Sequence, residues 1–334
     1  GPWGVGAWGV GAREMMTTEG TMLGWQGWQV RLPREWNPVR LDGTFDAGQV
    51  LVADLHRPQI GLRWSRFHPE AATTTDFLRD VMRGEAGAAA AESARAGERD
   101  GGAALTFLDH ETPGRDVHLW AAPSGRLLQI VYHAPRRDDV LERELLPTLA
   151  ETAARPARPW SVYDLSCRVP AQYALVSHRL NAGDLTLRFV APAGPPAPVT
   201  PPGPTDPRGP TDLHGPAALR AVRGPRRREF LNVRQIALAR LALKRMRLAQ
   251  WVDAQERDFL NGRYKPVAEM TVRQEVRRTS RRRRRFAFMP WLAPRVVTLA
   301  RHDVARDRLI IVQASDESVA TAVADAVGGV ECVS

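Results

Sequence analysis

The sequence contains little cysteine and no long apolar run, and each shortage excludes a class of protein. Two cysteines in 334 residues, Cys167 and Cys332, are too few for a disulfide framework. We therefore expect a reducing, cytoplasmic compartment, with a single bridge between the two left open. No segment approaches the roughly 18 consecutive apolar residues of a membrane span. An apolar fraction of 43% and a charged fraction of 25% are those of a globular protein.

Signatures of catalysis and of cofactor binding are also missing. There is no Gly-x-Ser-x-Gly motif and no phosphate-cradling glycine loop. The clusters that remain are incomplete. Pro113 and Gly114 break any helix that could position the cluster Asp109-His110-Glu111 with His118 around a metal. Asp54 and His56 have no nucleophile beside them, and Cys167 lacks an activating environment. We therefore expect a non-enzymatic protein without metal or cofactor, and keep an unrecognised hydrolase as the last alternative.

The clearest pattern that is present is an echo between the two halves of the chain. Three motifs occur in the first half and again, in the same order, in the second. In the first half they are Arg31-Leu32-Pro33-x-x-Trp36, Ala47-Gly48-x-Val50 and Arg126-Leu127-Leu128. Their counterparts in the second half are, in the same order, Arg168-Val169-Pro170-x-x-Tyr173, Ala182-Gly183-x-Leu185 and Arg308-Leu309-Ile310. The echo predicts two copies of one unit, at residues 25–154 and 155–334, after a disordered or extraneous segment 1–24.

Local patterns predict the elements of each unit. Strand-like alternation, as at Ile60, Leu62 and Trp64, recurs in both halves. Helices are expected at about 73–96, at 139–152, after a cap at Ser315 or Asp316, and above all at 230–260, which lacks proline and glycine. Further strands are expected at 105–108, 117–121, 127–132 and 308–313, and hairpins at 50–55 with 59–64 and at 270–278 with 284–288. The predicted fold class is α+β: two tandem α/β sandwich units, each an antiparallel sheet flanked by helices.

This arrangement resembles the PsbP-like and Mog-like family of α/β/α sandwich proteins. The resemblance rests on the Leu32-Pro33-x-x-Trp36 and Val169-Pro170-x-x-Tyr173 segments, a helix ending in Trp251, and the closing strand–helix pairs. It implies a non-catalytic binding or assembly protein, such as a secretion-effector chaperone, and assigns no functional residues. A proline-rich insert at 191–218 and an arginine-rich segment depart from the family pattern.

Positive charge is concentrated in one part of the second half. Residues 220–301 hold 23 basic and 6 acidic side chains, against 22 basic and 25 acidic in residues 1–219. The densest stretch is 277–285, where Arg277, Arg278 and Arg281 to Arg285 leave only Thr279 and Ser280 uncharged. Such a run either engages an anionic partner or is a solvated hairpin tip in a chain where only two basic residues are lysine.

The predicted partner-binding residues combine this run with the basic face of the expected helix. They are Arg277, Arg278, Arg281, Arg282, Arg283, Arg284, Arg285, Arg240, Lys244 and Arg247. We expect a protein partner with an acidic surface. The alternative is a nucleic-acid binder without sequence preference, because no zinc-finger or helix-turn-helix spacing accompanies the arginines. The ten tryptophans are expected mainly in the core.

Overall fold

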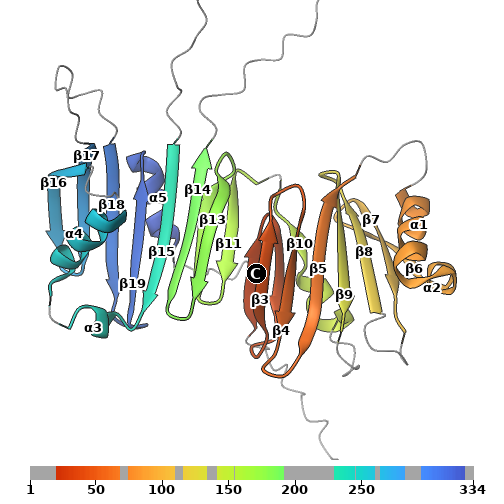
Figure 1. Ribbon diagram of the computed structural model, residues 1–334. Coiled ribbons are helices and arrows are strands. Elements are labelled where there is room, and N and C mark those ends of the chain that lie inside the picture. Colours follow the sequence, from red (N-terminus) through yellow and green to blue (C-terminus); the bar gives the residue numbers. More distant parts are fainter. Residues whose placement is uncertain are drawn as a thin grey trace, which may run out of the picture. The chain divides into compact units, whose positions relative to one another are not determined.

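The computed structural model describes residues 20–67, 74–109, 116–133, 141–153, 155–191, 229–244, 246–259, 264–282 and 295–327 (Figure 1). The chain forms two compact units. The first consists of Gly1–Leu23, Val30–Asp42 and Gln49–Ala150, and the second of Gly24–Gln29, Gly43–Gly48 and Glu151–Ser334. The boundaries expected from the sequence, 25–154 and 155–334, stay a prediction. Among the described residues, no helix is both long enough and apolar enough to span a membrane.

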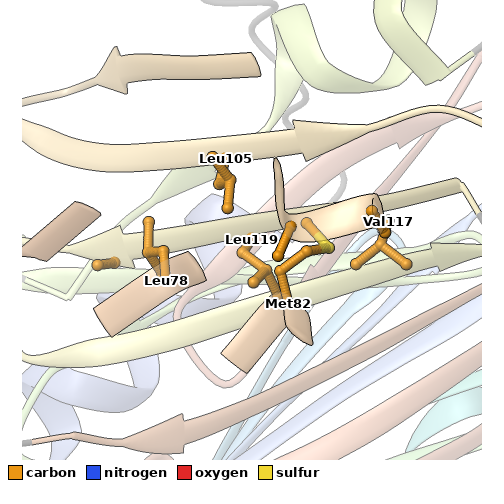
Figure 2. Packing of buried hydrophobic residues seen from close by; sticks show 8 residues of the cluster. Leu78, Met82, Leu105, Val117 and Leu119 are labelled. Carbon is orange, nitrogen blue, oxygen red and sulfur yellow. The ribbon is translucent and has the colours of Figure 1, made fainter. Parts of the chain in front are cut away.

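The first unit is built on an antiparallel sheet of seven strands in the order β3-β4-β5-β9-β8-β7-β6. Helix α1 (Thr74–Ala86) packs on β7 and β8, followed by α2 (Ala88–Ser93). Leu78 and Met82 of α1 meet Leu105 and Leu119 of the sheet in an apolar core (Figure 2). The strands are β3 (Asn37–Gly43), β4 (Gly48–Ala53), β5 (Pro58–Arg66), β6 (Arg95–Arg99), β7 (Gly102–Phe107), β8 (Asp116–Ala122) and β9 (Arg126–Tyr132).

The second unit contains another antiparallel sheet of seven strands, in the order β13-β14-β15-β19-β18-β17-β16. Helix α4 (Leu248–Phe259) covers one face at β17 and β18, and α5 (Glu317–Ala326) covers the other at β18 and β19 (Figure 1). A short helix, α3 (Ala239–Ala242), follows β15. The strands are β13 (Ala174–Asn181), β14 (Asp184–Ala191), β15 (Glu229–Ala237), β16 (Tyr264–Val272), β17 (Glu275–Arg282), β18 (Arg295–Asp303) and β19 (Arg308–Ala314).

The two large sheets have the same connectivity when each is numbered from its own first strand. The echoed motifs fall at equivalent places. The amide of Trp36 donates to the carbonyl of Pro33 at 3.0 Å, and the amide of Tyr173 donates to that of Pro170 at 3.0 Å, so both motifs form the same turn. Arg126 begins β9 and Arg308 begins β19, and each of these is the last strand of its sheet in chain order.

A third sheet of five strands has the order β10-β2-β1-β11-β12. Its strands are β1 (Thr21–Trp25), β2 (Trp28–Leu32), β10 (Ala150–Glu151), β11 (Ala157–Val162) and β12 (Leu165–Pro170). Within the second unit, the rings of Trp25 and Trp160 meet edge to face at 5.3 Å, and Trp160 meets Phe189 at 5.0 Å. The core position expected for tryptophan is confirmed for Trp25, Trp28, Trp36, Trp64, Trp120, Trp160 and Trp251.

The predicted α+β fold class is wrong, because the protein is mostly β structure arranged in three antiparallel sheets. The largest error is the helix at 230–260. Residues 229–237 instead form β15, a central strand paired with β14 on one side and β19 on the other. Pairing of β15 with β14 on one edge and with β19 on the other outweighs the helix propensity of its residues. Helix α4 begins only at Leu248.

Two smaller predictions also fail. Residues 270–278, expected as one strand of a hairpin, instead span the turn between β16 and β17, where Arg273 has a φ of 51°, and the expected partner 284–288 lies outside the described residues. The helix expected at 139–152 is reduced to short helical turns over Leu141–Leu145 and Leu146–Thr148, followed by β10. Residues 192–218 of the proline-rich insert lie outside the described residues.

Other local predictions are confirmed. The strands expected at 105–108, 117–121, 127–132 and 308–313 correspond to β7, β8, β9 and β19, and β4 neighbours β5 as the first predicted hairpin requires. The last helix begins where a cap was expected, since the Asp316 carboxylate accepts a hydrogen bond from the Val319 amide at 3.1 Å.

Candidate functional site

The structure divides the arginine-rich segment between the two faces of β17. Side chains of successive strand residues point to opposite faces. Val276, Arg278 and Ser280 are buried on the face covered by α4. Arg277 lies on the face of α5, where it is ion-paired with Glu317. The backbone of Arg282 ends β17, and Arg283 to Arg285 lie outside the described residues.

Arg278 is a buried structural residue. Its guanidinium donates to Glu269 at 2.8 Å and to Asp253 of α4 at 2.9 Å, and lies 3.6 Å from Glu256. Burial alone would lower the pKa of Arg278, but the hydrogen bond to Glu269 and the three carboxylates raise it. Arg278 is therefore removed from the predicted binding set, because a guanidinium held this way is not available to a partner.

The contacts of Arg278 continue across the sheet as one polar row. Glu256 accepts hydrogen bonds from Ser280 at 3.0 Å and from Thr298. Thr298 in turn accepts from Gln313 at 3.4 Å, and Gln313 accepts from Asn232 at 3.0 Å. The register places Asn232, Gln313, Thr298, Arg278 and Glu269 directly opposite one another on five neighbouring strands. This row joins α4 to the sheet beside an apolar cluster, in which Trp251 and Val252 of α4 pack on residues of β17, β18 and β19.

On the opposite face, the structure brings together three cations that the sequence keeps apart. Lys265 of β16 lies opposite Arg281 of β17, and Arg281 lies opposite Arg295 of β18. Lys265 and Arg295 are exposed and Arg281 is half-buried. Like charges directly opposite across strands destabilise a sheet. Within the described part of the chain, none of the three has an ion-pair partner, and the buried Nε of Arg281 has no acceptor. We call Lys265, Arg281 and Arg295 the basic row.

An apolar groove lies further along the same face, between the sheet and α5. Its volume is about 360 Å³. Met270 and Val272 of β16, Leu299 of β18 and Ile310 of β19 supply its apolar walls. The two arginines at its rim are engaged by the fold, because Arg277 pairs with Glu317 and Arg301 donates to the carbonyl of Val327 at 3.0 Å. Glu275 and Asp325 also line the groove, so the face combines cations without ion-pair partners among the described residues at one end with a largely apolar, partly acidic surface at the other.

The remaining predicted residues, Arg240, Lys244 and Arg247, lie at the other end of the sheet. All three are exposed. The amide of Arg240 donates to Asp307 at 2.8 Å, in the turn between β18 and β19, whereas Arg295 begins β18. The nine residues of β18 separate these ends by about 26 Å, at roughly 3.3 Å per residue. The predicted set is thus not one site.

The structure describes several members of the clusters noted in the sequence. Asp54 lies in the turn between β4 and β5, where it accepts hydrogen bonds from the amides of His56 and Arg57, and these bonds lower the pKa of its carboxyl group. His118 is buried and its ring bonds Thr106 at 2.8 Å; burial lowers the pKa of His118 to about 4. Among the described residues, no group of acidic, histidine or cysteine side chains has the geometry of a metal site.

Cys167 is fully buried and free, and burial raises the pKa of its thiol to about 12. A thiol so difficult to ionise is a poor nucleophile. His110, Glu111 and Cys332 lie outside the described residues.

Comparisons with known proteins add little. No protein-family model and no curated protein matches the chain. Among solved structures, the chain is similar to the immunity protein TplEi of the T6SS of Pseudomonas aeruginosa, solved in complex with the "L" peptide. The match has 10% sequence identity and a TM-score of 0.28, and covers 93% of this chain and 98% of that one. A TM-score this low establishes no shared fold, and the resemblance to PsbP-like and Mog-like proteins stays a prediction.

Proposed function

We propose that this protein is a non-enzymatic binding module whose second unit binds an acidic segment of a partner protein at the basic row. The observation that carries the proposal is the row itself: Lys265, Arg281 and Arg295 stand side by side without ion-pair partners among the described residues. A carboxylate-bearing partner would relieve their mutual repulsion and accept hydrogen bonds from the two guanidinium groups.

The apolar groove beside the row supports a protein partner over a nucleic acid. Binding of single-stranded nucleic acid generally combines a basic groove with aromatic side chains on which bases stack. The exposed large apolar side chains of the described residues are all aliphatic, and Met270 and Val272 are two of them. Such side chains suit the valine, leucine or isoleucine of a protein segment. The buried free Cys167 agrees with the cytoplasmic location that we include in the proposal.

The proposal is tested by comparing two matched charge-removal variants. One is the triple variant Lys265→Gln, Arg281→Gln, Arg295→Gln. The control is Arg240→Gln, Lys244→Gln, Arg247→Gln, which removes the same charge at the other end of the sheet. Binding is measured by fluorescence anisotropy with two labelled probes: a peptide of alternating valine and threonine that ends in two glutamates, and a single-stranded oligonucleotide of matched length.

We expect the row variant to lose at least tenfold in peptide affinity and the control to lose about threefold or less, because long-range attraction is screened within about 10 Å at 0.1 M salt. Equal losses in both variants would contradict a localised site. An oligonucleotide that binds more tightly than the peptide, with an affinity that falls steeply as salt is raised, would establish the nucleic-acid alternative instead.

A further inference from the structure

We infer that the acidic partner segment binds as an eighth strand, added antiparallel to the free edge of β16. This inference rests on the proposed function and specifies how the segment is held. Strand β16 is the outermost strand of its sheet, and among the described residues it pairs with β17 alone. All of its nine residues except Tyr264 are exposed. An edge strand offers unpaired backbone donors and acceptors to another chain.

The equivalent edge of the first unit shows what a protected edge looks like in this connectivity. Strand β6 has the corresponding place, as the fourth strand of its sheet in chain order and the outermost in space. It has five residues, Arg95–Arg99, and three of them are charged. Short length and charge are common means of preventing edge-to-edge pairing. Strand β16 is nearly twice as long, and its Val267, Met270 and Val272 are each more than half exposed.

Most protective features of β16 lie in its first half, where Lys265 and Pro266 are found together with an irregularity in the register between Pro266 and Ala268. The charged residue of the second half, Glu269, accepts a hydrogen bond from Arg278. From Ala268 to Val272 the register with β17 is regular. This five-residue stretch is open to pairing, and alternate side chains, Met270 and Val272, line the apolar groove.

The positive charge of the basic row determines which kind of segment can pair with the edge of β16. The basic row begins at Lys265, about 16 Å from Met270 along the strand at roughly 3.3 Å per residue. An added strand therefore needs apolar side chains at alternate positions and acidic residues at the end next to Lys265. Every strand pair of this sheet with a defined register is antiparallel, and we expect the same of the added strand. Because Lys265 lies near the amino end of β16, the acidic residues belong at the carboxyl end of the segment. A second copy of β16 fits poorly, because Lys265 and Arg273 flank the open stretch and bring further positive charge.

Backbone methylation of the probe distinguishes strand addition from side-chain binding alone. The parent is an amidated peptide of six alternating valine and threonine residues followed by two glutamates. Two derivatives carry N-methyl groups on every other residue, one set on the valines and one on the threonines. Side chains and charge are unchanged, but one set of methyl groups removes the amides that would face β16. We expect one derivative to bind at least tenfold more weakly, since its methyl groups remove two or three backbone hydrogen bonds to β16.

Two further comparisons complete the test. A peptide with the glutamates at its amino end should bind several-fold more weakly than the parent. The variant Met270→Ser with Val272→Ser should weaken binding of the parent, while Val39→Ser, an exposed valine of β3, should not.

Equal binding of the parent and both methylated derivatives would overturn strand addition, and the proposed function would stand if the basic-row variant still lost affinity. A free protein that is dimeric, and becomes monomeric on Met270→Ser, would also overturn it, because a second copy would already occupy the edge.

Discussion

The two large sheets differ in a row of side chains that occupies the same place in both. Arg126 begins β9 and Arg308 begins β19, so Val131 of the first sheet corresponds by position along its strand to Gln313 of the second. The rows built around these residues lie under a helix in each unit. The first row is Gly61, Val131, Val117 and Phe107, and the second is Asn232, Gln313, Thr298 and Arg278.

One connectivity therefore accepts beneath its helix either an apolar cluster alone or an apolar cluster extended by a polar row. In the first unit, Leu78 and Met82 of α1 bury apolar surface that tolerates small shifts in position. In the second, Glu256 of α4 requires two hydroxyl donors and a nearby guanidinium at defined places. A polar layer of this kind is sensitive to the loss of any one member, because the partner that remains is buried without compensation.

The largest expected effect comes from breaking the polar layer at Arg278. We expect Arg278→Met to lower the free energy of unfolding by about 3–5 kcal/mol, because it leaves the buried carboxylate of Glu256 without a counter-ion. Urea denaturation of the full chain, followed by circular dichroism, measures the change.

A compensated variant separates the loss of the pair from the loss of packing. Arg278→Met combined with Glu256→Leu makes this layer resemble that of the first unit, and we expect it to recover a large part of the lost stability. A single variant that stayed within about 1 kcal/mol of the natural protein would show that the polar row does not hold α4 in place.

The same comparison explains how much of the fold was predictable from the sequence. Strands with strict alternation, such as Ile60, Leu62 and Trp64, are found where expected, because the pattern is local. Strand β15 was missed because its residues favour a helix when considered alone. Leu231 and Val233 alternate with Asn232 and Arg234, but only pairing with β14 and β19 selects the strand.

The candidate site was only partly predictable for a related reason. Arg281 was identified from the arginine run, but Lys265 and Arg295 were missed because strand register, not sequence distance, brings them beside it. The misassignment of Arg278 was avoidable in principle. A strand interpretation of 275–282 places Arg278 and Ser280 on one face and Arg277 and Arg281 on the other.

A second prediction concerns the face of the first sheet turned away from α1, where His118 corresponds to Leu299 of the second sheet. The pKa of His118 is lowered from 6.5 to about 4 by burial and by the charge of Arg99. The unfolded chain therefore binds a proton between these values and the folded chain does not. Stability is fully present above about pH 6.5 and falls as the pH falls toward 4, by up to about 3 kcal/mol.

The variant His118→Leu isolates this contribution, since it introduces the residue found at the corresponding place in the second sheet. We expect the variant to lose stability less steeply than the natural protein between pH 6.5 and 4, as measured by urea denaturation at several pH values. Parallel pH profiles for the two proteins would show that His118 is not held neutral by the fold.

The smallest expected effect tests whether neighbouring arginines really belong to different environments. Arg277 and Glu317 form an ion pair whose side chains are 40% and 56% exposed, so water and salt screen their attraction. We expect Arg277→Ala to change the free energy of unfolding by less than about 1 kcal/mol, several-fold less than Arg278→Met in the same denaturation experiment. The two residues are adjacent in sequence and identical in type, so a difference of this size can arise only from the alternation of β17 between a buried polar layer and a solvated face. Equal losses at both positions would mean that the two faces do not differ as the structure requires.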